Sequence, residues 1–106
     1  MSFNSQRIRR IRRLARDAEV RESEGLFVVE GPRLVEEAID ASLKIDEVIL
    51  PEDQLDHELI TVLSEEKIQF HLVARKIFDG LTTLRNPQAA IASVHKHGHE
   101  LGDLIQ

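Results

Sequence analysis

One stretch predicts how this chain folds: Leu26-Phe27-Val28-Val29-Glu30-Gly31-Pro32-Arg33-Leu34-Val35-Glu36-Glu37-Ala38. Its first four residues are apolar, which is typical of a central strand that is covered on both faces. Pro32 favours the first helical position, because it has no N–H to leave unpaired and its φ is already set. One helical face then collects Leu34, Val35, Ala38 and Ile39. The corner therefore joins a buried strand to an amphipathic helix.

The length of 106 residues predicts one domain with a core of its own. The composition, 42% apolar and 31% charged, is that of a globular protein. There is no cysteine, which excludes a disulfide framework, a thiol nucleophile and a thiolate metal site. No apolar run approaches the roughly 20 residues of a membrane span, and no signal-peptide pattern opens the chain. We therefore expect a cytoplasmic protein that does not bind a membrane.

The net charge of −5 conceals an asymmetry along the chain. Residues 1–21 contain seven arginines against two acidic residues, which gives this arm a charge of +5. The remaining 85 residues contain seven basic and 17 acidic side chains, which gives the body a charge of −10. Two interpretations are open: a polyanionic partner binds at the basic end, or the arm is a solvated helix face balanced by the acids of the body.

Residues 4 to 16 have the spacing of an amphipathic helix, which Asn4 or Ser5 can cap. A narrow apolar stripe is formed by Ile8, Ile11, Leu14 and Ala15. The rest of the helix surface carries Arg9, Arg10, Arg12, Arg13 and Arg16. The guanidinium group matches phosphate in bidentate fashion, which a solvated lysine does not. We expect the helix to dock on the domain by its stripe and to present a row of arginines to a nucleic-acid backbone.

Beyond the corner, the apolar pattern alternates between strands and helices. Strands are predicted at 44–50, 68–74 and 89–94, and helices at 54–66 and 75–84. Asp53 is the expected cap of the first of these helices, whose buried face comprises Leu55, Leu59, Val62 and Leu63. Residues 17–25 form either a loop or a short helix. The order predicts a three-layer α/β/α domain in which a short sheet lies between helices.

The corner at Glu30-Gly31-Pro32-Arg33 is the first candidate for a binding site. A helix N-terminus presents free N–H groups and a partial positive charge, and Arg33 adds a full charge. Against phosphate binding, Glu30 is repulsive, Pro32 lacks a donor, and no glycine-rich phosphate loop is present. We therefore expect no tight nucleotide-phosphate pocket at this corner. The corner either grips an RNA backbone loosely or is a capped helix whose glycine only makes the turn.

A second candidate combines Arg75 with the loop Arg85-Asn86-Pro87-Gln88. Pro87 pushes Asn86 into an extended conformation, so this stretch is predicted to be a loop. Asn and Gln hydrogen-bond to base edges, and Arg stacks on bases or pairs with phosphate. Taken alone, the stretch is also explained as an ordinary proline-containing loop.

The histidines His95, His97 and His99 are the third candidate. On an extended strand they share one face, which suits a transition metal. Metal sites usually gather ligands from separate elements with supporting hydrogen bonds, however, and a terminal tail offers neither. We therefore expect no metal here. The sequence contains no Ser–His–Asp pattern and no paired carboxylates in an apolar frame, so we also expect no catalytic residues.

Three pieces of this sequence together resemble one family. They are Arg9-x-x-Arg-Arg-Leu14-x-Arg16, the run from Arg21 through Gly25 to Ala38, and Asn86-Pro87-Gln88 leading into residues 89–94. They are similar to the N-terminal substrate-binding domain of the SpoU, or TrmH-type, RNA ribose 2′-O-methyltransferases. The resemblance extends from about residue 4 to residue 95.

The resemblance implies a fold of the L30e and L7Ae type, with a mixed four-stranded sheet between helices. It also implies that structured RNA binds at the corner after the first strand and at the loop before the last one. These positions are Gly31, Pro32 and Arg33 here, and Asn86, Pro87 and Gln88, so the first two candidates become neighbours. The predicted RNA-binding residues are Arg9, Arg12, Arg13, Arg16, Gly31, Arg33, Arg75, Arg85, Asn86 and Gln88.

In this family, S-adenosylmethionine is held by a separate C-terminal knotted domain, which also supplies catalysis and dimerisation. The sequence departs from the family pattern at Ala89, where Gly is usual, and it stops at Gln106 before any such domain. We therefore expect a non-catalytic chain, as an excised domain or a truncated reading frame. Its expected parts are an arm (1–21), an RNA-binding domain (22–96) and a tail or linker (97–106).

The resemblance implies that the chain recognises ribosomal or transfer RNA for a methyltransferase domain that these 106 residues lack. It also implies that the full-length protein forms a homodimer through that domain. Two alternatives remain open. One is a stand-alone RNA-binding protein of the L7Ae type. The other is a protein-interaction domain whose basic helix docks an acidic partner.

Overall fold

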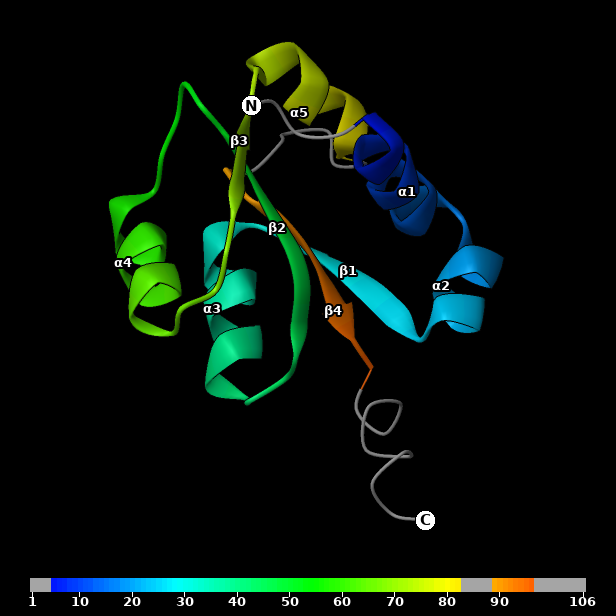
Figure 1. The fold of residues 1–106 in the computed structure, drawn as a ribbon, viewed down its shortest axis with the longest axis horizontal. Coiled ribbons are helices and arrows are strands. Elements are labelled where there is room, and N and C mark those ends of the chain that lie inside the picture. Colours follow the sequence, from blue (N-terminus) through cyan, green and yellow to red (C-terminus); the bar gives the residue numbers. More distant parts are fainter. Residues whose placement is uncertain (1–4, 83–88, 97–106) are drawn as a thin grey trace.

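The computed structural model describes residues 5–82 and 89–96 of the chain. Its elements, in order, are α1 (Ser5–Arg16), α2 (Ala18–Glu24), β1 (Leu26–Glu30), α3 (Pro32–Asp40), β2 (Ile45–Pro51), α4 (His57–Glu65), β3 (His71–Val73), α5 (Arg75–Leu81) and β4 (Ile91–His95). The predicted alternation of strands and helices is confirmed (Figure 1). The open choice for residues 17–25 is resolved in favour of a short helix.

The four strands form one mixed sheet in the order β1-β4-β2-β3. β4 runs antiparallel to both β1 and β2, whereas β2 and β3 are parallel. A parallel pair needs a crossover connection, and the segment containing α4 supplies it here. The last strand of the chain thus lies in the middle of the sheet. The predicted α/β fold with a small mixed sheet is confirmed, while its likeness to L30e and L7Ae stays a prediction.

The prediction that residues 26–29 form a central strand is wrong, because β1 lies at one edge of the sheet. Its apolar run has another cause, since α1, α2 and α3 all pack against this strand. Leu26 is buried, and the other four residues of β1 are half-buried. The central strands are β4 and β2. The small side chains of Ala92 and Ser93 in β4, and of Ala89 and Ala90 just before it, are buried.

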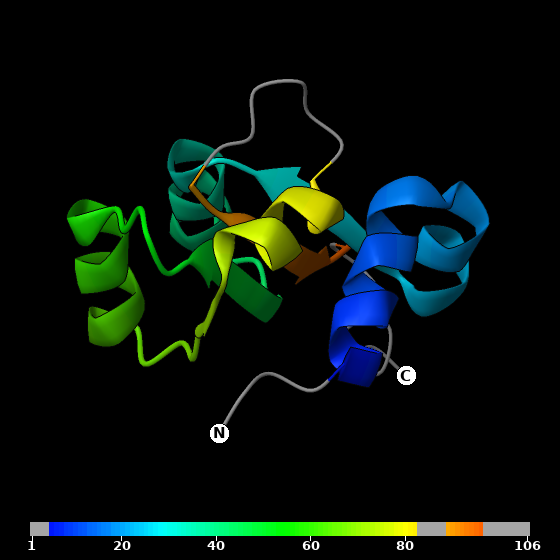
Figure 2. The same ribbon diagram turned by 90° about the horizontal axis from the view of Figure 1, so that it is seen from above.

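Helices lie on both faces of the sheet, which gives three layers (Figures 1 and 2). On the face of α3 and α4, the core is Val35, Ala38, Val48, Leu50, Leu59, Leu63, Ala90, Ala92 and Val94. On the face of α1 and α5, the core is Ile11, Ile49, Val73, Phe78, Leu81 and Ile91. Neighbouring residues of β2 and β4 alternate between the two cores, as the two-residue period of a strand requires.

The amphipathic N-terminal helix forms as predicted and packs by its apolar stripe, with Ile11 and Leu14 fully buried. Of the two predicted capping residues, Asn4 lies outside the described residues and Ser5 is the first residue of α1. Asp17 caps α2 by accepting hydrogen bonds from the N–H groups of Glu19 and Val20. Gly25 ends α2 in the left-handed region at φ 69°, which a residue without Cβ adopts at little cost. The arm is therefore an integral part of the folded body.

The helix predicted over 54–66 begins later, at His57, and its cap is Asp56 instead of Asp53. The carboxylate of Asp56 accepts from the N–H of Leu59 at 2.9 Å. Asp53 pairs with Arg75 and is not available as a cap. Of the predicted buried face, Leu59 and Leu63 are fully buried, while Leu55 and Val62 are half-buried.

The boundaries of four further elements differ from the prediction. β3 starts only at His71, because Lys67 takes a left-handed φ of 59° and the N–H of Ile68 still bonds to the carbonyl of Leu63. α5 ends at Leu81, and the last two residues predicted for it lie outside the described part of the chain. β2 and β4 run from Ile45 to Pro51 and from Ile91 to His95, so that each ends one residue later than expected.

The helix after the corner does not bury every residue of its predicted apolar face. Val35 and Ala38 are buried, but the side chain of Leu34 is 48% exposed. Leu34 forms the rim of an open apolar hollow of about 220 Å³ between β1 and α3. The residues lining it, here called the β1–α3 groove, are Phe27, Val29, Leu34, Glu37, Ala38, Ala41 and Leu43.

Candidate nucleic-acid interface

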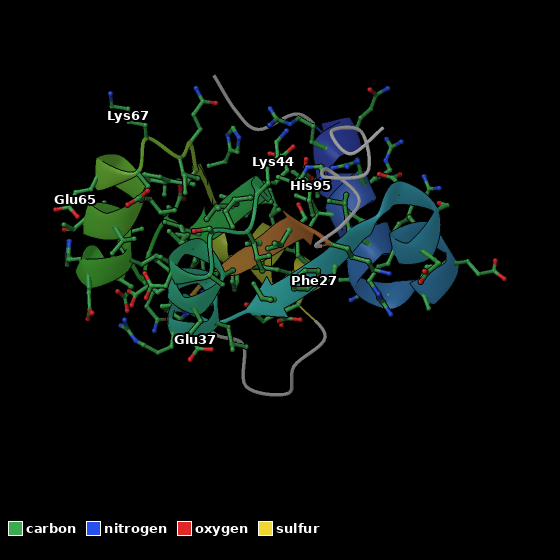
Figure 3. All side chains as sticks on the ribbon, turned by 90° about the horizontal axis from the view of Figure 1, so that it is seen from below. Phe27, Glu37, Lys44, Glu65, Lys67 and His95 are labelled. Carbon is green, nitrogen blue, oxygen red and sulfur yellow. The ribbon has the colours of Figure 1, made fainter. Side chains whose placement is uncertain are left out.

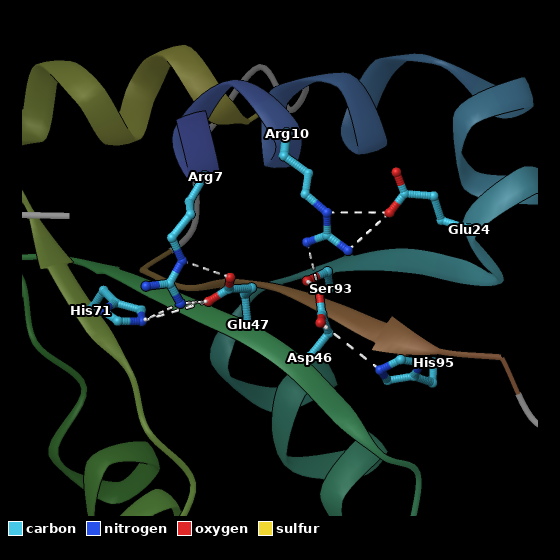
Figure 4. Close-up of polar contacts among 8 residues, drawn as sticks. All are labelled: Arg7, Arg10, Glu24, Asp46, Glu47, His71, Ser93 and His95. Atoms are coloured by element: carbon cyan, nitrogen blue, oxygen red, sulfur yellow. Dashed lines mark hydrogen bonds and ion pairs between the residues drawn. The ribbon is translucent and has the colours of Figure 1, made fainter. Parts of the chain in front are cut away.

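The arginines of α1 divide into three groups according to what each guanidinium contacts. The inner group is Arg7 and Arg10, which reach down to the sheet (Figure 4). Arg7 binds Glu47 through two hydrogen bonds, with Nε 3.0 Å from Oε2 and Nη2 2.7 Å from Oε1. The hydrogen bond with Glu47 is the main reason that the pKa of Arg7 lies above its ordinary value. Arg7 therefore anchors the first turn of α1 to β2.

Arg10 makes the second anchor and joins three elements. Its Nη1 lies 2.9 Å from Oδ2 of Asp46 in β2, and its Nη2 lies 2.9 Å from Oε1 of Glu24 in α2. Burial lowers the pKa of Arg10, but hydrogen bonds and attraction to these two carboxylates outweigh burial and leave the pKa raised. The buried Ser93 of β4 also donates to Asp46, at 2.8 Å. Such charge-assisted hydrogen bonds are the stronger ones in proteins.

Two histidines border these anchors, and the sequence predicts no role for either. Nε2 of His71 lies 3.1 Å from Nη2 of Arg7 and 3.5 Å from Oε1 of Glu47. Nε2 of His95 lies 3.9 Å from Oδ1 of Asp46. His71 is half-buried within this network. The partners are 24 to 64 positions apart along the chain, so no local pattern signals them.

The second group, Arg12 and Arg16, lies over the end of α5. The Nε of Arg12 and the Nη2 of Arg16 donate to the carbonyl oxygen of Gly80, at 3.3 and 3.2 Å. Carbonyls in the last turn of a helix lack a partner within the helix, and cations near them are favourable. These arginines hold α1 beside Thr82, the last described residue before the segment 83–88.

The third group is Arg9 and Arg13, which lie four residues apart on one face of α1. Both side chains are exposed. Within the described ranges 5–82 and 89–96, neither makes a hydrogen bond or an ion pair. Their charges are therefore available to a partner. With the exposed Arg16 one turn further on, they form a basic stripe, here called the α1 stripe: Arg9, Arg13 and Arg16.

The corner after β1 contacts described residues on both sides of the 83–88 segment. The N–H of Gly31 donates to the carbonyl of Ala90 at 2.9 Å. The hydroxyl of Thr82 donates to the carboxylate of Glu30. The corner thus contacts both the residue before this segment and a residue shortly after it. Glu30 is engaged at the corner, and Arg85, Asn86, Pro87 and Gln88 lie outside the described residues.

Arg33 and Arg75, two further predicted RNA-binding residues, point toward acidic neighbours. Arg33 contacts Glu36, Asp56 and Glu58 at 2.6 to 3.3 Å, and the hydrogen bond with Glu36 is the main cause of its raised pKa. Arg75 contacts Asp53 and Asp79, lies over the ring of Phe78 and has its pKa raised chiefly by Asp53. In both clusters the carboxylates outnumber the guanidinium, so phosphate finds little net attraction there.

No group of three or more metal-ligating side chains occurs among the described residues. Of the three histidines considered for a metal, only His95 is described, and it faces Asp46; His97 and His99 lie outside the description. In the same described ranges, no helix is long and apolar enough to cross a membrane. Charge on α1, and not a metal cluster, is thus the feature that points to a ligand.

The family model of the MRM3-like substrate-binding domain matches residues 5–92. The chain belongs to this family. The match covers α1 through the start of β4, so the arginine-bearing helix lies within the family domain together with the sheet. The comparison with curated proteins gives no match.

Several solved structures that resemble this chain are methyltransferases. An RNA 2′-O ribose methyltransferase shares 26% identity and a TM-score of 0.72, over 88% of this chain and 35% of its own. The SpoU methyltransferase AviRb from Streptomyces viridochromogenes, solved with AdoMet, shares 18% identity and a TM-score of 0.68, over 85% of this chain and 32% of its own. An rRNA methyltransferase from Sinorhizobium meliloti shares 22% identity and a TM-score of 0.69, over 91% of this chain and 36% of its own. The chain thus spans about a third of the length of these relatives.

Proposed function

We propose that this MRM3-like domain binds structured RNA and holds it for a ribose 2′-O-methyltransferase domain outside these 106 residues. The observation that carries the proposal is the α1 stripe, in which Arg9 and Arg13 are exposed and have no partner within the described ranges. Arginine exposed in this way contacts phosphate well, because its planar group donates two parallel hydrogen bonds. Family membership supports the same function.

The position of the stripe also supports this proposal. Arg16 and Arg12 tie the C-terminal half of α1 to Gly80, which lies two residues before Thr82. Thr82 and Ala90 in turn contact the corner at Glu30 and Gly31. An RNA backbone lying along α1 would therefore approach Thr82 and Ala90, which flank the segment predicted from the sequence to carry Arg85, Asn86 and Gln88 in a loop. These three residues remain predicted base or phosphate contacts.

S-adenosylmethionine belongs, in this proposal, to the further domain that supplies the methyl-transfer chemistry. The β1–α3 groove does not fit it, because Glu37 is the one charged side chain among otherwise apolar lining residues. A nucleoside and an amino-acid carboxylate need several convergent polar groups. We therefore assign this chain no step in methyl transfer, and its work is to bind and orient RNA.

A filter-binding titration of the 106-residue chain against ribosomal and transfer RNA fragments tests the proposal. We expect weak binding. The logarithm of the association constant should fall linearly with the logarithm of salt concentration, with a slope of about −2 to −4 from the phosphate contacts of the α1 stripe and its neighbours. Transfer RNA and ribosomal RNA are run in parallel to find the preferred class. Absence of binding at about 50 mM salt, where phosphate contacts are strongest, would contradict the proposal.

A further inference from the structure

The outer edge of β1 has backbone groups directed away from the sheet. The N–H of Gly31 bonds to the carbonyl of Ala90, and the N–H of Lys96 bonds to the carbonyl of Gly25. Hydrogen-bonded pairs alternate along an antiparallel ladder. The backbone N–H and C=O groups of Phe27 and Val29 therefore point toward β4, whereas those of Leu26 and Val28 point outward. In the part of the chain that the structure describes, these outward groups have no hydrogen-bond partner.

Edge strands are normally protected against pairing with other chains by charge, proline or a covering element. β1 is protected in part, because α1, α2 and α3 pack against it. Three consecutive residues, Phe27, Val28 and Val29, are nevertheless apolar and only half-buried, and its single charged residue, Glu30, is engaged by Thr82. A half-buried apolar edge of this kind is suited to the addition of a strand.

The β1–α3 groove is lined by residues of this edge strand and of α3, among them Phe27 and Glu37, which Figure 3 labels. Phe27 and Val29 form its floor from β1, and Leu34, Ala38 and Leu43 come from α3 and the segment that follows it. In a strand added beside β1, every second side chain would lie on the same face as Phe27 and Val29. Those side chains would therefore enter the groove, so the edge and the groove form one continuous surface.

The charge around the groove selects the chemistry of the partner. Glu37 lines the groove, and Asp40 lies one turn further along α3. Both are exposed, and neither has an ion-pair partner among the described residues. By contrast, Glu36 is paired with Arg33 and Glu22 with Lys96. Two unpaired carboxylates beside an apolar groove attract a cationic, apolar segment and repel RNA.

We propose that the outer edge of β1 and the β1–α3 groove bind an extended segment of a partner protein in which apolar residues alternate with lysine or arginine. The segment adds a strand to β1, its apolar side chains fill the groove, and its cations pair with Glu37 and Asp40. This surface is separate from the α1 stripe. It therefore gives the domain a protein-binding face in addition to its RNA-binding face.

A second copy of this chain fits the surface less well than a basic segment does. Pairing of two β1 edges about a two-fold axis would bring two copies of Glu37 and Asp40 to the same interface. Like charges that face each other across an interface are unfavourable. Self-association through this edge is therefore an outcome that would contradict the proposal.

The test uses a fluorescein-labelled ten-residue peptide of alternating valine and lysine, titrated against the 106-residue chain by fluorescence anisotropy. The matched peptide has glutamate in place of lysine. We expect the lysine peptide to bind at least about tenfold more tightly than the glutamate peptide. Amide NMR shifts should be concentrated at Val28 and in α3. Equal binding of the two peptides, or shifts concentrated elsewhere, would overturn the proposal.

Two variants with matched controls separate this site from general attraction to an acidic protein. Glu37→Lys should weaken lysine-peptide binding about fivefold, whereas Glu65→Lys, an equal charge change on α4, should leave it within about twofold. Leu34→Ser should weaken it about fivefold, whereas Leu72→Ser, at the other edge of the sheet, should not. These four side chains are exposed, so folding is expected to survive each change.

The proposal is overturned if Glu37→Lys and Glu65→Lys weaken binding of the lysine peptide equally. It is also overturned if sedimentation of the free chain shows a concentration-dependent dimer that Leu34→Ser abolishes, because a second copy would then be the occupant. The result of the RNA titration is independent of both outcomes, since the α1 stripe is not altered.

Discussion

Nη1 of Arg10 lies 2.9 Å from Oδ2 of Asp46, which ties the arginine-rich helix α1 to the second strand of the sheet. The buried hydroxyl of Ser93 donates to the same carboxylate oxygen. A cluster of arginines that resembles a nucleic-acid arm in the sequence therefore contains residues that hold the fold together. The same helix presents other arginines outward, and the two uses can be separated by substitution.

Arg10→Ala is expected to lower the free energy of unfolding by about 1–2 kcal/mol, because Asp46 and Glu24 lose a charged hydrogen-bond donor. The control is Arg9→Ala at the next position of α1, which removes an exposed side chain and should change stability by less than about 0.5 kcal/mol. Urea denaturation of both variants measures the difference. Equal stability of the two would show that the contact between Arg10 and Asp46 contributes nothing.

Leu14→Ala is expected to destabilise the chain by about 2–4 kcal/mol, because Leu14 is fully buried in the interface between α1 and the body. Leu72→Ala, at an exposed position of β3, is the control and should have an effect below about 0.5 kcal/mol. Thermal unfolding followed by circular dichroism distinguishes them. If Leu14→Ala left the midpoint unchanged, α1 would be an appendage and not part of the core.

Gly31→Ala and Gly80→Ala should change stability in opposite directions. Gly31 has φ 108° and ψ 142°, a region in which a side chain is strained, so alanine is expected to cost about 1–3 kcal/mol. Gly80 lies within α5, and an added Cβ would lie 3.5 Å from the Arg12 side chain, an ordinary contact. Alanine there should add about 0.5–1 kcal/mol through helix propensity. Chemical denaturation of both variants measures the signs, and a neutral Gly31→Ala would contradict the account of the corner.

Arg33→Ala is expected to reduce RNA affinity less than Arg13→Ala does. The guanidinium of Arg33 already contacts three carboxylates, whereas Arg13 has no partner within the described residues. A phosphate approaching Arg33 would have to displace those carboxylates or tolerate their repulsion. Filter-binding titrations of the two variants at one salt concentration test the order. A larger loss with Arg33→Ala would restore the corner after β1 as a principal contact.

Much of the fold follows from local pattern in the sequence. Three short-range signals predicted most elements to within a few residues. They are the apolar stripe of Ile11 and Leu14, the proline at the start of α3, and the alternation of strand and helix patterns along the chain. The choice of cap for α4 failed because Asp53 and Asp56 are both good caps. Only the distant contact of Asp53 with Arg75 shows which one is engaged elsewhere.

The position of β1 could not be read from its apolar run, because helices that pack on both faces make an edge strand look like a central one. The inward contacts of Arg7 and Arg10 could not be predicted either. Their partners, Glu47 and Asp46, lie about 40 residues away along the chain. Arg7 and Arg10 also share helix α1 with Arg9 and Arg13, which point outward. Side-chain direction on α1, and not the number of arginines, separates structural from available charge.

The RNA affinity of the double variant Arg9→Glu/Arg13→Glu tests the central claim most directly. Its control, Lys67→Glu/Lys76→Glu, changes the net charge equally at two exposed positions outside α1. Filter binding at about 50 mM salt should show a loss of at least about tenfold for the α1 variant and much less for the control, with both chains as stable as the unmodified protein. Equal affinities for the two variants would contradict the assignment of RNA binding to the α1 stripe.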